Sequence, residues 1–231
     1  MNLLVSDYDD TFNNSVVSVE ENIEAIKSFI SNGNIFTIAT ARDYRSIKGE
    51  INKYKIPYSY LITNNGATLF DNNDKILHFT LIGYNEFIKA YTYLKRLNFI
   101  KKIKILNMHA TPTPSYNNTI EIECYIEDEH LDKIPQIQEA INYLKCENVD
   151  NFLFVEPFTE KTDSIRLLAQ KLYVNEKNIY TIGDNYNDED MLRTFNGFIV
   201  PNAIEHLKYE FETIESVSSL VRRIERTKWK K

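Results

Sequence analysis

Three carboxylates follow a short apolar segment close to the N-terminus. The segment Leu3–Ser6 has the apolar character of a buried strand, and Asp7, Asp9 and Asp10 come directly behind it. Burying a charge is costly unless the charge is paired or bound to a metal ion. We therefore expect a cation at this strand end, where one carboxylate is also well placed to act as a nucleophile.

The elements that must position these carboxylates alternate between strand and helix. Apolar runs and helical spacing predict strands at Leu3–Ser6, Ile35–Thr40 and Tyr60–Thr63, and helices at Glu20–Ser31 and Tyr44–Lys55. This βαβαβ order predicts a parallel sheet with right-handed crossover connections.

The pattern changes in the middle of the chain. After a hairpin predicted over residues 67–79, we expect a smaller α+β arrangement, with helices at Tyr84–Leu97 and Leu131–Lys145 and strands at Lys102–Met108, Thr119–Ile126 and Phe152–Val155. We interpret residues 81–156 as an inserted domain. The expected core then consists of residues 1–80 and 157–231.

The alternation of strand and helix resumes after the insertion and predicts a doubly wound α/β sheet. The expected elements are helices at Asp163–Leu172 and Asp188–Phe195, strands at Ile179–Ile182 and Phe198–Val200, and final helices at Ala203–Tyr209 and Ser216–Arg226. In an open α/β sheet, ligands bind beyond the carboxyl ends of the strands. Polar residues follow four such ends, and they are Asp7 with Asp9, Thr40, Asn64-Asn65-Gly66, and Gly183 with Asp184.

Four segments, taken in this order, resemble the four motifs of the haloacid dehalogenase (HAD) superfamily. They are Asp7-Tyr8-Asp9-Asp10-Thr11, Thr40-Ala41-Arg42, Lys161, and Gly183-Asp184-Asn185-Tyr186-Asn187-Asp188. The segment Asn65-Gly66-Ala67 and the mid-chain insertion resemble the Cof-like subfamily, which carries a large α/β cap domain. The resemblance covers nearly the whole chain and implies a Rossmann-like core with an inserted cap.

The resemblance implies phosphate-ester hydrolysis, which is among the slowest uncatalysed reactions and needs a very large barrier reduction. Asp7 would be the nucleophile and would form an aspartyl-phosphate. Mg²⁺ would neutralise the approaching anions, held by Asp7, Asp184 and the backbone carbonyl of Asp9. Asp188 would contact the metal directly or hold one of its ligands.

The second carboxylate of the first motif has a role of its own. On an extended segment, Asp9 would return its side chain to the same side as Asp7, and it could protonate the leaving alkoxide and then activate water. Two close carboxylates should raise one of their pKa values, as an acid requires. Phosphate or substrate contacts are expected from six residues, which are Thr40, Ala41, Arg42, Asn64, Lys161 and Asn187.

Several of these residues have a simpler interpretation. Arg42 could be a surface ion-pair partner instead of a substrate contact, and Asp10 and Thr11 could only satisfy backbone groups of a turn. Asp10 and Ala41 also stand where the family usually has glycine. A side chain at Asp10 has to fit the turn without a positive φ, or point to solvent.

Composition excludes several other classes of function. The formal net charge of −6 disfavours nucleic-acid binding, which depends on clustered Lys and Arg. Cys124 and Cys146 form no metal-binding pattern and fit a reducing compartment. The first residues lack the basic and apolar regions typical of a signal peptide, and no apolar run is long enough to span a bilayer, so we expect a cytoplasmic protein without membrane contact.

The sequence therefore predicts a Mg²⁺-dependent phosphatase of a small phosphorylated metabolite, with sugar phosphates as the first guess from the resemblance. The insertion would close over the phosphate, and its candidate substrate contacts are His109, Thr111, Thr113 and Tyr116. Three alternatives remain open at this point: a phosphosugar mutase, a phospho-receiver signalling domain, and a catalytically silent binding protein.

Overall fold

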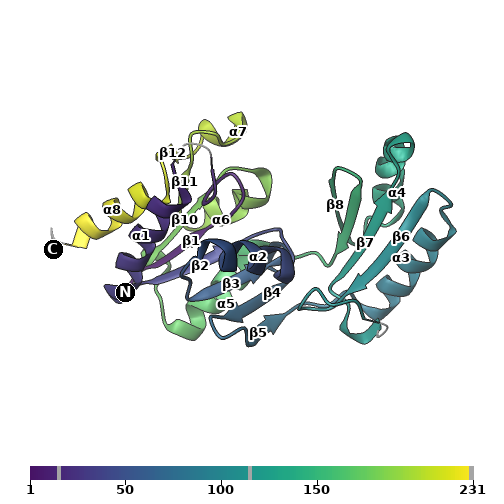
Figure 1. The fold of residues 1–231 in the computed structure, drawn as a ribbon, viewed down its shortest axis with the longest axis horizontal. Coiled ribbons are helices and arrows are strands. Elements are labelled where there is room, and N and C mark those ends of the chain that lie inside the picture. Colours follow the sequence, from purple (N-terminus) through teal and green to yellow (C-terminus); the bar gives the residue numbers. More distant parts are fainter. Residues whose placement is uncertain (15–16, 114–115, 229–231) are drawn as a thin grey trace. The chain divides into compact units, whose positions relative to one another are not determined.

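The computed structural model describes residues 1–14, 17–113 and 116–228. Contacts divide the chain into two compact units, Met1–His78 with Glu160–Lys231 (unit 1) and Phe79–Thr159 (unit 2) (Figure 1). The predicted insertion, residues 81–156, differs from unit 2 by two residues at its start and three at its end. No helix among the described residues has the length and apolar character needed to cross a bilayer.

Unit 1 is built on an eight-stranded sheet with the order β12-β11-β10-β1-β2-β3-β4-β5 within the described residues. Strands β12 to β3 in this order pair in parallel, and β4 runs antiparallel to β3. The strands are β1 (Leu3–Ser6), β2 (Ile35–Ala39), β3 (Tyr60–Thr63), β4 (Thr68–Asp71), β5 (Ile76–Phe79), β10 (Ile179–Gly183), β11 (Asn196–Ile199) and β12 (Glu212–Thr213). The predicted doubly wound α/β fold is confirmed, although the short strand β12 was not predicted.

Helices cover both faces of this sheet because successive side chains of a strand point to opposite sides. Leu4 of β1 packs in a core with α1, α2 and α8, whereas Leu3 and Val5 pack in a second core with α5 and α6. Helices α1 and α8 come from opposite ends of the chain yet lie side by side (Figure 1). The helices are α1 (Val19–Ser31), α2 (Tyr44–Tyr54), α5 (Lys161–Leu172), α6 (Glu189–Thr194), α7 (Glu205–Lys208) and α8 (Val217–Lys228), with 3₁₀ turns η1 (Asn64–Gly66), η4 (Glu176–Asn178) and η5 (Tyr186–Asp188).

Unit 2 is a four-stranded antiparallel sheet with the order β6-β7-β9-β8 within the described residues. Alternate residues of β7, Ile122, Cys124 and Ile126, pack in one apolar core with residues of α3 and α4. The elements are α3 (Tyr84–Arg96), β6 (Ile100–Leu106), η2 (Tyr116–Asn118), β7 (Glu121–Ile126), η3 (Asp128–Lys133), α4 (Ile134–Ala140), β8 (Lys145–Val149) and β9 (Phe152–Glu156).

One prediction in unit 2 is wrong in extent. The helix expected at Leu131–Lys145 is a 3₁₀ turn up to Lys133 followed by a short helix that ends at Ala140, and Lys145 begins strand β8. Pro135 explains the late start, because its ring fits only the first turn of an α-helix, where it is found. Strand β8 was not predicted, because apolar and polar residues do not alternate in its sequence, Lys145 to Val149.

Candidate active site

A buried ammonium group joins two carboxylates at the carboxyl ends of the unit 1 strands. Lys161 Nζ, from the first residue of α5, lies 2.7 Å from Asp7 Oδ1 and 2.7 Å from Asp188 Oδ1. The Lys161 side chain is only 1% exposed, and those of Asp7 and Asp188 are 8% and 0% exposed. Asp7 directly follows β1 and Asp188 ends η5, so strands distant in sequence supply the two partners.

A third carboxylate completes the group. Asp184 directly follows β10, and it offers an oxygen within 4.8 Å of ligand oxygens of Asp7 and Asp188. The Thr11 hydroxyl donates a 2.5 Å hydrogen bond to Asp184 Oδ1 and is fully buried. Thr11 therefore does more than satisfy a turn, and only its place in the first motif could have signalled this contact.

Asp188 is held from its other side by the backbone. Its Oδ2 accepts hydrogen bonds from the amides of Asp184 (3.0 Å) and Asn185 (3.2 Å). Gly183 makes this approach possible, because a Cβ atom at Gly183 would lie 2.5 Å from Asp188 Cγ. Asp188 is thus fully engaged by Lys161 and two amides, which makes it a residue that fixes the neighbouring loop.

Burial governs the electrostatics of the cluster. Burial raises the pKa of Asp7 well above its ordinary value, and the charge of Lys161 opposes this rise only in part. Burial likewise raises the pKa of Asp184 to about 6, although the hydrogen bond from Thr11 acts in the opposite direction. Burial acts to lower the pKa of Lys161, but the charges of Asp188 and Asp7 outweigh it and raise that pKa.

The donor set fits a hard divalent cation. When Asp7, Asp184 and Asp188 are all ionised, the single ammonium of Lys161 leaves an excess of two negative charges in a buried cluster. In the described part of the chain, the hydrogen bonds of Asp7 and Asp184 use Oδ1, so Oδ2 of each remains for a cation. Carboxylate oxygens are the ligands that Mg²⁺ prefers.

The Asp9 carboxylate does not join this cluster. It forms a two-pronged ion pair with Arg42, with 2.7 Å from Nε to Oδ2 and 2.6 Å from Nη2 to Oδ1. The Asp9 side chain is 47% exposed, which sets it apart from the buried carboxylates. Arg42 is therefore an ion-pair partner, and its partner is a residue that the sequence assigned to catalysis.

The remaining phosphate-site candidates come together through hydrogen bonds between loops. The amide of Asn64 donates to the Arg42 carbonyl (3.0 Å), and the amide of Asn65 donates to the Thr40 carbonyl (3.1 Å). Asn187 Nδ2 donates to Asn65 Oδ1 at 3.2 Å. The loops after β2, β3 and β10 are thereby joined at one edge of the sheet.

The two positions that usually hold glycine behave differently. Asp10 adopts φ +56° and is exposed, so of the two arrangements expected for its side chain the structure shows the second, in which it points to solvent. Aspartate tolerates the left-handed region better than most residues. Ala41 lies half-buried between Thr40 and Arg42, without a positive φ.

The candidate substrate contacts of the insertion lie in unit 2. The amides of His109 and Thr111 both donate to Asn107 Oδ1, at 3.0 and 3.1 Å, and so shape the loop after β6. The Thr113 amide donates to the carbonyl of Ile105 at 2.9 Å. Tyr116 packs its ring on aromatic rings of α3, which is a structural role. Substrate contact by these four residues stays a prediction.

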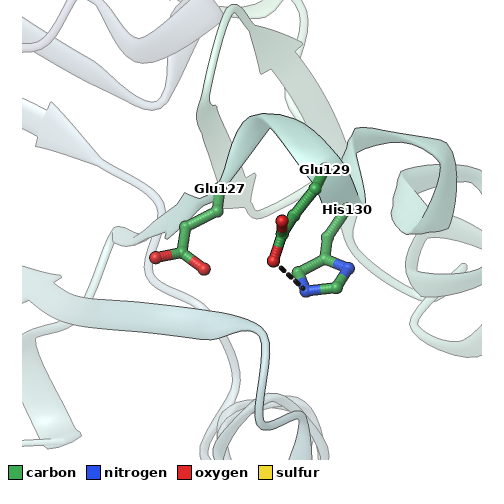
Figure 2. Close-up of side chains that lie close together, drawn as sticks. All are labelled: Glu127, Glu129 and His130. Atoms are coloured by element: carbon green, nitrogen blue, oxygen red, sulfur yellow. Dashed lines mark ion pairs between the residues drawn. The ribbon is translucent and has the colours of Figure 1, made fainter.

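Unit 2 also carries a second group of possible metal ligands. Figure 2 shows Glu127, Glu129 and His130 at the turn after β7, with His130 Nε2 3.4 Å from Glu129 Oε1. Their side chains are 40%, 74% and 34% exposed, and Lys101 pairs with Glu127 at 3.2 Å. Solvent and Lys101 stabilise these charges, in contrast to the buried cluster at Asp7.

Known sequences identify the family. A profile of the haloacid dehalogenase-like hydrolases matches residues 4–160 and 152–215 of the chain. The chain belongs to the haloacid dehalogenase-like hydrolases. The predicted membership of the haloacid dehalogenase superfamily is confirmed by this match. Membership of a hydrolase family argues against the phospho-receiver alternative.

Individual relatives of this HAD hydrolase agree with the assignment. A protein of Buchnera aphidicola subsp. Baizongia pistaciae, to which a phosphatase function is attributed, is 26% identical over 84% of each chain. A solved structure from Plasmodium vivax, attributed to the HAD/COF-like hydrolases, has a TM-score of 0.80 at 18% identity and covers 98% of this chain and 96% of its own. A solved HAD subclass IIB sugar phosphatase has a TM-score of 0.72 at 17% identity, over 99% of both chains. At these identities the solved structures show the shared fold.

Proposed function

We propose that this HAD hydrolase is a Mg²⁺-dependent phosphatase of a small phosphorylated metabolite. The observation that carries the proposal is the buried cluster in which Lys161 holds Asp7 beside Asp184 and Asp188, with an excess of negative charge. The attribution of phosphatase function to the Buchnera relative supports the reaction class. The likeness to a solved sugar phosphatase makes sugar phosphates the first substrates to test.

Two of the proposed metal ligands, the carboxylates of Asp7 and Asp184, lie close together. Asp7, Asp184 and the backbone carbonyl of Asp9 would hold Mg²⁺, and Asp188 would keep Lys161 and the Asp184 loop in place. When bound, Mg²⁺ would neutralise charge on Asp7 and on the phosphoryl oxygens, which lets one anion approach another.

The first chemical step forms a covalent intermediate. A carboxylate oxygen of Asp7 attacks phosphorus, an O–P bond forms, and the ester P–O bond to the leaving alkoxide breaks. Asp9, protonated on one oxygen while the other still accepts from Arg42, gives its proton to the alkoxide oxygen, so that an alcohol leaves. Lys161 holds Asp7 in position and offers positive charge to a phosphoryl oxygen.

The second step returns the enzyme to its starting state. Water attacks phosphorus while Asp9, now ionised, accepts its proton, and the bond between phosphorus and Asp7 breaks. Orthophosphate leaves, and Asp7 is a carboxylate again. The Thr40 hydroxyl and the Asn187 amide are the proposed donors to phosphoryl oxygens in both steps.

A screen of phosphorylated metabolites with and without Mg²⁺ tests the proposal. We expect Mg²⁺-dependent release of phosphate from at least one substrate, and loss of that release in Asp7→Asn. Substrate labelled in its phosphoryl group, followed by an acid quench, should leave label on the wild-type protein and none on Asp7→Asn. Product chromatography distinguishes hydrolysis from isomerisation by a mutase.

Two outcomes would contradict the proposal. The first is a folded protein that releases no phosphate from any substrate of the screen with Mg²⁺ present. The second is Asp7→Asn with full Mg²⁺-dependent turnover, which would exclude the covalent route.

A further inference from the structure

The Asp9 carboxylate is held in one orientation by a guanidinium group that has several partners of its own. Arg42 engages both oxygens of Asp9 through Nε and Nη2, at 2.7 and 2.6 Å. Its third nitrogen, Nη1, donates to Ser46 Oγ at 3.1 Å. A planar fork bonded in this way fixes the direction as well as the charge of its partner.

The guanidinium also rests on a buried aromatic ring. The Cζ atom of Arg42 lies 5.4 Å from the centroid of Tyr8, which is fully buried although it stands between the two aspartates of the first motif. The Tyr8 hydroxyl donates to Glu50 Oε2 on α2 at 3.0 Å. Tyr8 is stacked on Phe12, and both rings belong to the buried apolar core, so the ring beneath Arg42 is packed on all its other contacts.

We propose that Arg42 is a positioning residue for Asp9, and that Tyr8 with Glu50 supports Arg42. This inference rests on the proposed function, in which Asp9 is the general acid and base. Arg42 fixes the side-chain rotamer of Asp9, and Glu50 fixes the ring on which Arg42 lies. These contacts join the first motif to α2. Arg42 of the second motif then acts on catalysis through Asp9.

An ordinary surface ion pair would not affect catalysis, and the chain offers such a pair for comparison. Arg223 also engages both oxygens of a carboxylate, that of Glu212, and its Cζ lies 5.0 Å from the centroid of Phe198. Neither Arg223 nor Glu212 belongs to the proposed catalytic residues. Arg223→Ala is therefore a matched control that removes the same kinds of contact.

The experiment compares Arg42→Ala, Arg42→Lys, Tyr8→Phe and Arg223→Ala with wild type, on an alkyl phosphate and on p-nitrophenyl phosphate. For the alkyl phosphate we expect kcat to fall about 10- to 100-fold in Arg42→Ala, which is part of the usual general acid-base contribution, while KM changes less than about 3-fold. Arg42→Lys should recover part of the loss, Tyr8→Phe should lose less than Arg42→Ala, and Arg223→Ala should match wild type.

The aryl substrate separates positioning of Asp9 from a general structural effect. Its leaving group needs little protonation, so the first step should be nearly as fast in Arg42→Ala as in wild type. The second step still needs Asp9 as a base, so the acid-quenched variant should carry more aspartyl-phosphate at steady state than wild type does. A variant that is merely less folded would carry less aspartyl-phosphate than wild type.

Several results would overturn the inference. An unchanged kcat in Arg42→Ala, or a raised KM with kcat intact, would assign Arg42 to surface packing or to substrate binding. If Arg42→Ala does not fold, the same readouts on Arg42→Lys and Tyr8→Phe decide the question, and wild-type kinetics in both would reject it. An inactive wild-type protein, or a fully active Asp9→Asn, would instead be a failure of the proposed function.

Discussion

Lys161 Nζ lies 2.7 Å from Asp7 Oδ1, although 154 positions separate the two residues in the chain. Asp7 follows the central strand β1, and Lys161 begins the first helix after unit 2. The contact ties the two sequence segments of unit 1 together at the candidate site. Its burial makes the pair sensitive to any change that removes one partner.

Loss of the ammonium should destabilise the protein. Lys161→Met leaves Asp7 and Asp188 buried without their cation, and we expect unfolding free energy to fall by about 3–5 kcal/mol without divalent metal. Urea denaturation measures this change. The control is Lys171→Met, an exposed position of the same helix, which should change stability by less than about 0.5 kcal/mol. Equal effects of the two substitutions would contradict the assignment of a buried ion pair.

Gly183 should not tolerate a larger side chain, whereas Gly49 should. A Cβ at Gly183 would lie 2.5 Å from Asp188 Cγ, so we expect Gly183→Ala to cost about 1–3 kcal/mol and to displace Asp188. A Cβ at Gly49 meets nothing within 4 Å, so Gly49→Ala should stabilise α2 by up to about 1 kcal/mol. Thermal unfolding of both variants checks the opposite signs.

The Thr11 hydroxyl should tune metal binding through Asp184. Thr11→Val removes the 2.5 Å hydrogen bond to Asp184 Oδ1, and we expect Mg²⁺ affinity to fall by about 10-fold or more. Thr11→Ser keeps a hydroxyl and should bind Mg²⁺ nearly as wild type does. Titration of the melting temperature with Mg²⁺ measures this without relying on activity. Equal shifts of the melting temperature with Mg²⁺ in the Val and Ser variants would contradict the proposed role of the hydroxyl.

Asp184 should make the metal-free protein less stable as pH rises. Its pKa is raised in the folded state from 3.8 to about 6, so the folded state binds the proton more tightly than the unfolded state does. The resulting stabilisation is complete below about pH 4 and is lost as pH rises through about 6. Asp184→Asn removes this cost, so it should stabilise the metal-free protein more at pH 7.5 than at pH 4. Denaturation with a chelator present, at both pH values, measures the change in unfolding free energy that the substitution causes. An equal change at the two pH values would contradict the prediction.

The sequence by itself determined the framework. Apolar strands and amphipathic helices have local periodicities, so the order of the elements in unit 1, apart from the short strand β12, could be read from residue spacing. Parallel strands place their carboxyl ends at one edge, which is why residues as distant as Asp7 and Asp184 could be expected to meet there. The limits of unit 2 could also be approached, because the alternation of strand and helix stops and later resumes.

Only the tertiary structure decided which side chains pair with which. Asp9 was expected on the same side as Asp7, and the structure adds that its carboxylate pairs with Arg42, while the Thr11 hydroxyl donates to Asp184. Such choices depend on side-chain rotamers and on loops that meet only after folding, and no local period encodes them. The helix predicted up to Lys145 was wrong for a related reason, because Lys145 begins strand β8, and β8 pairs with β9 in a way that its own residue pattern does not encode.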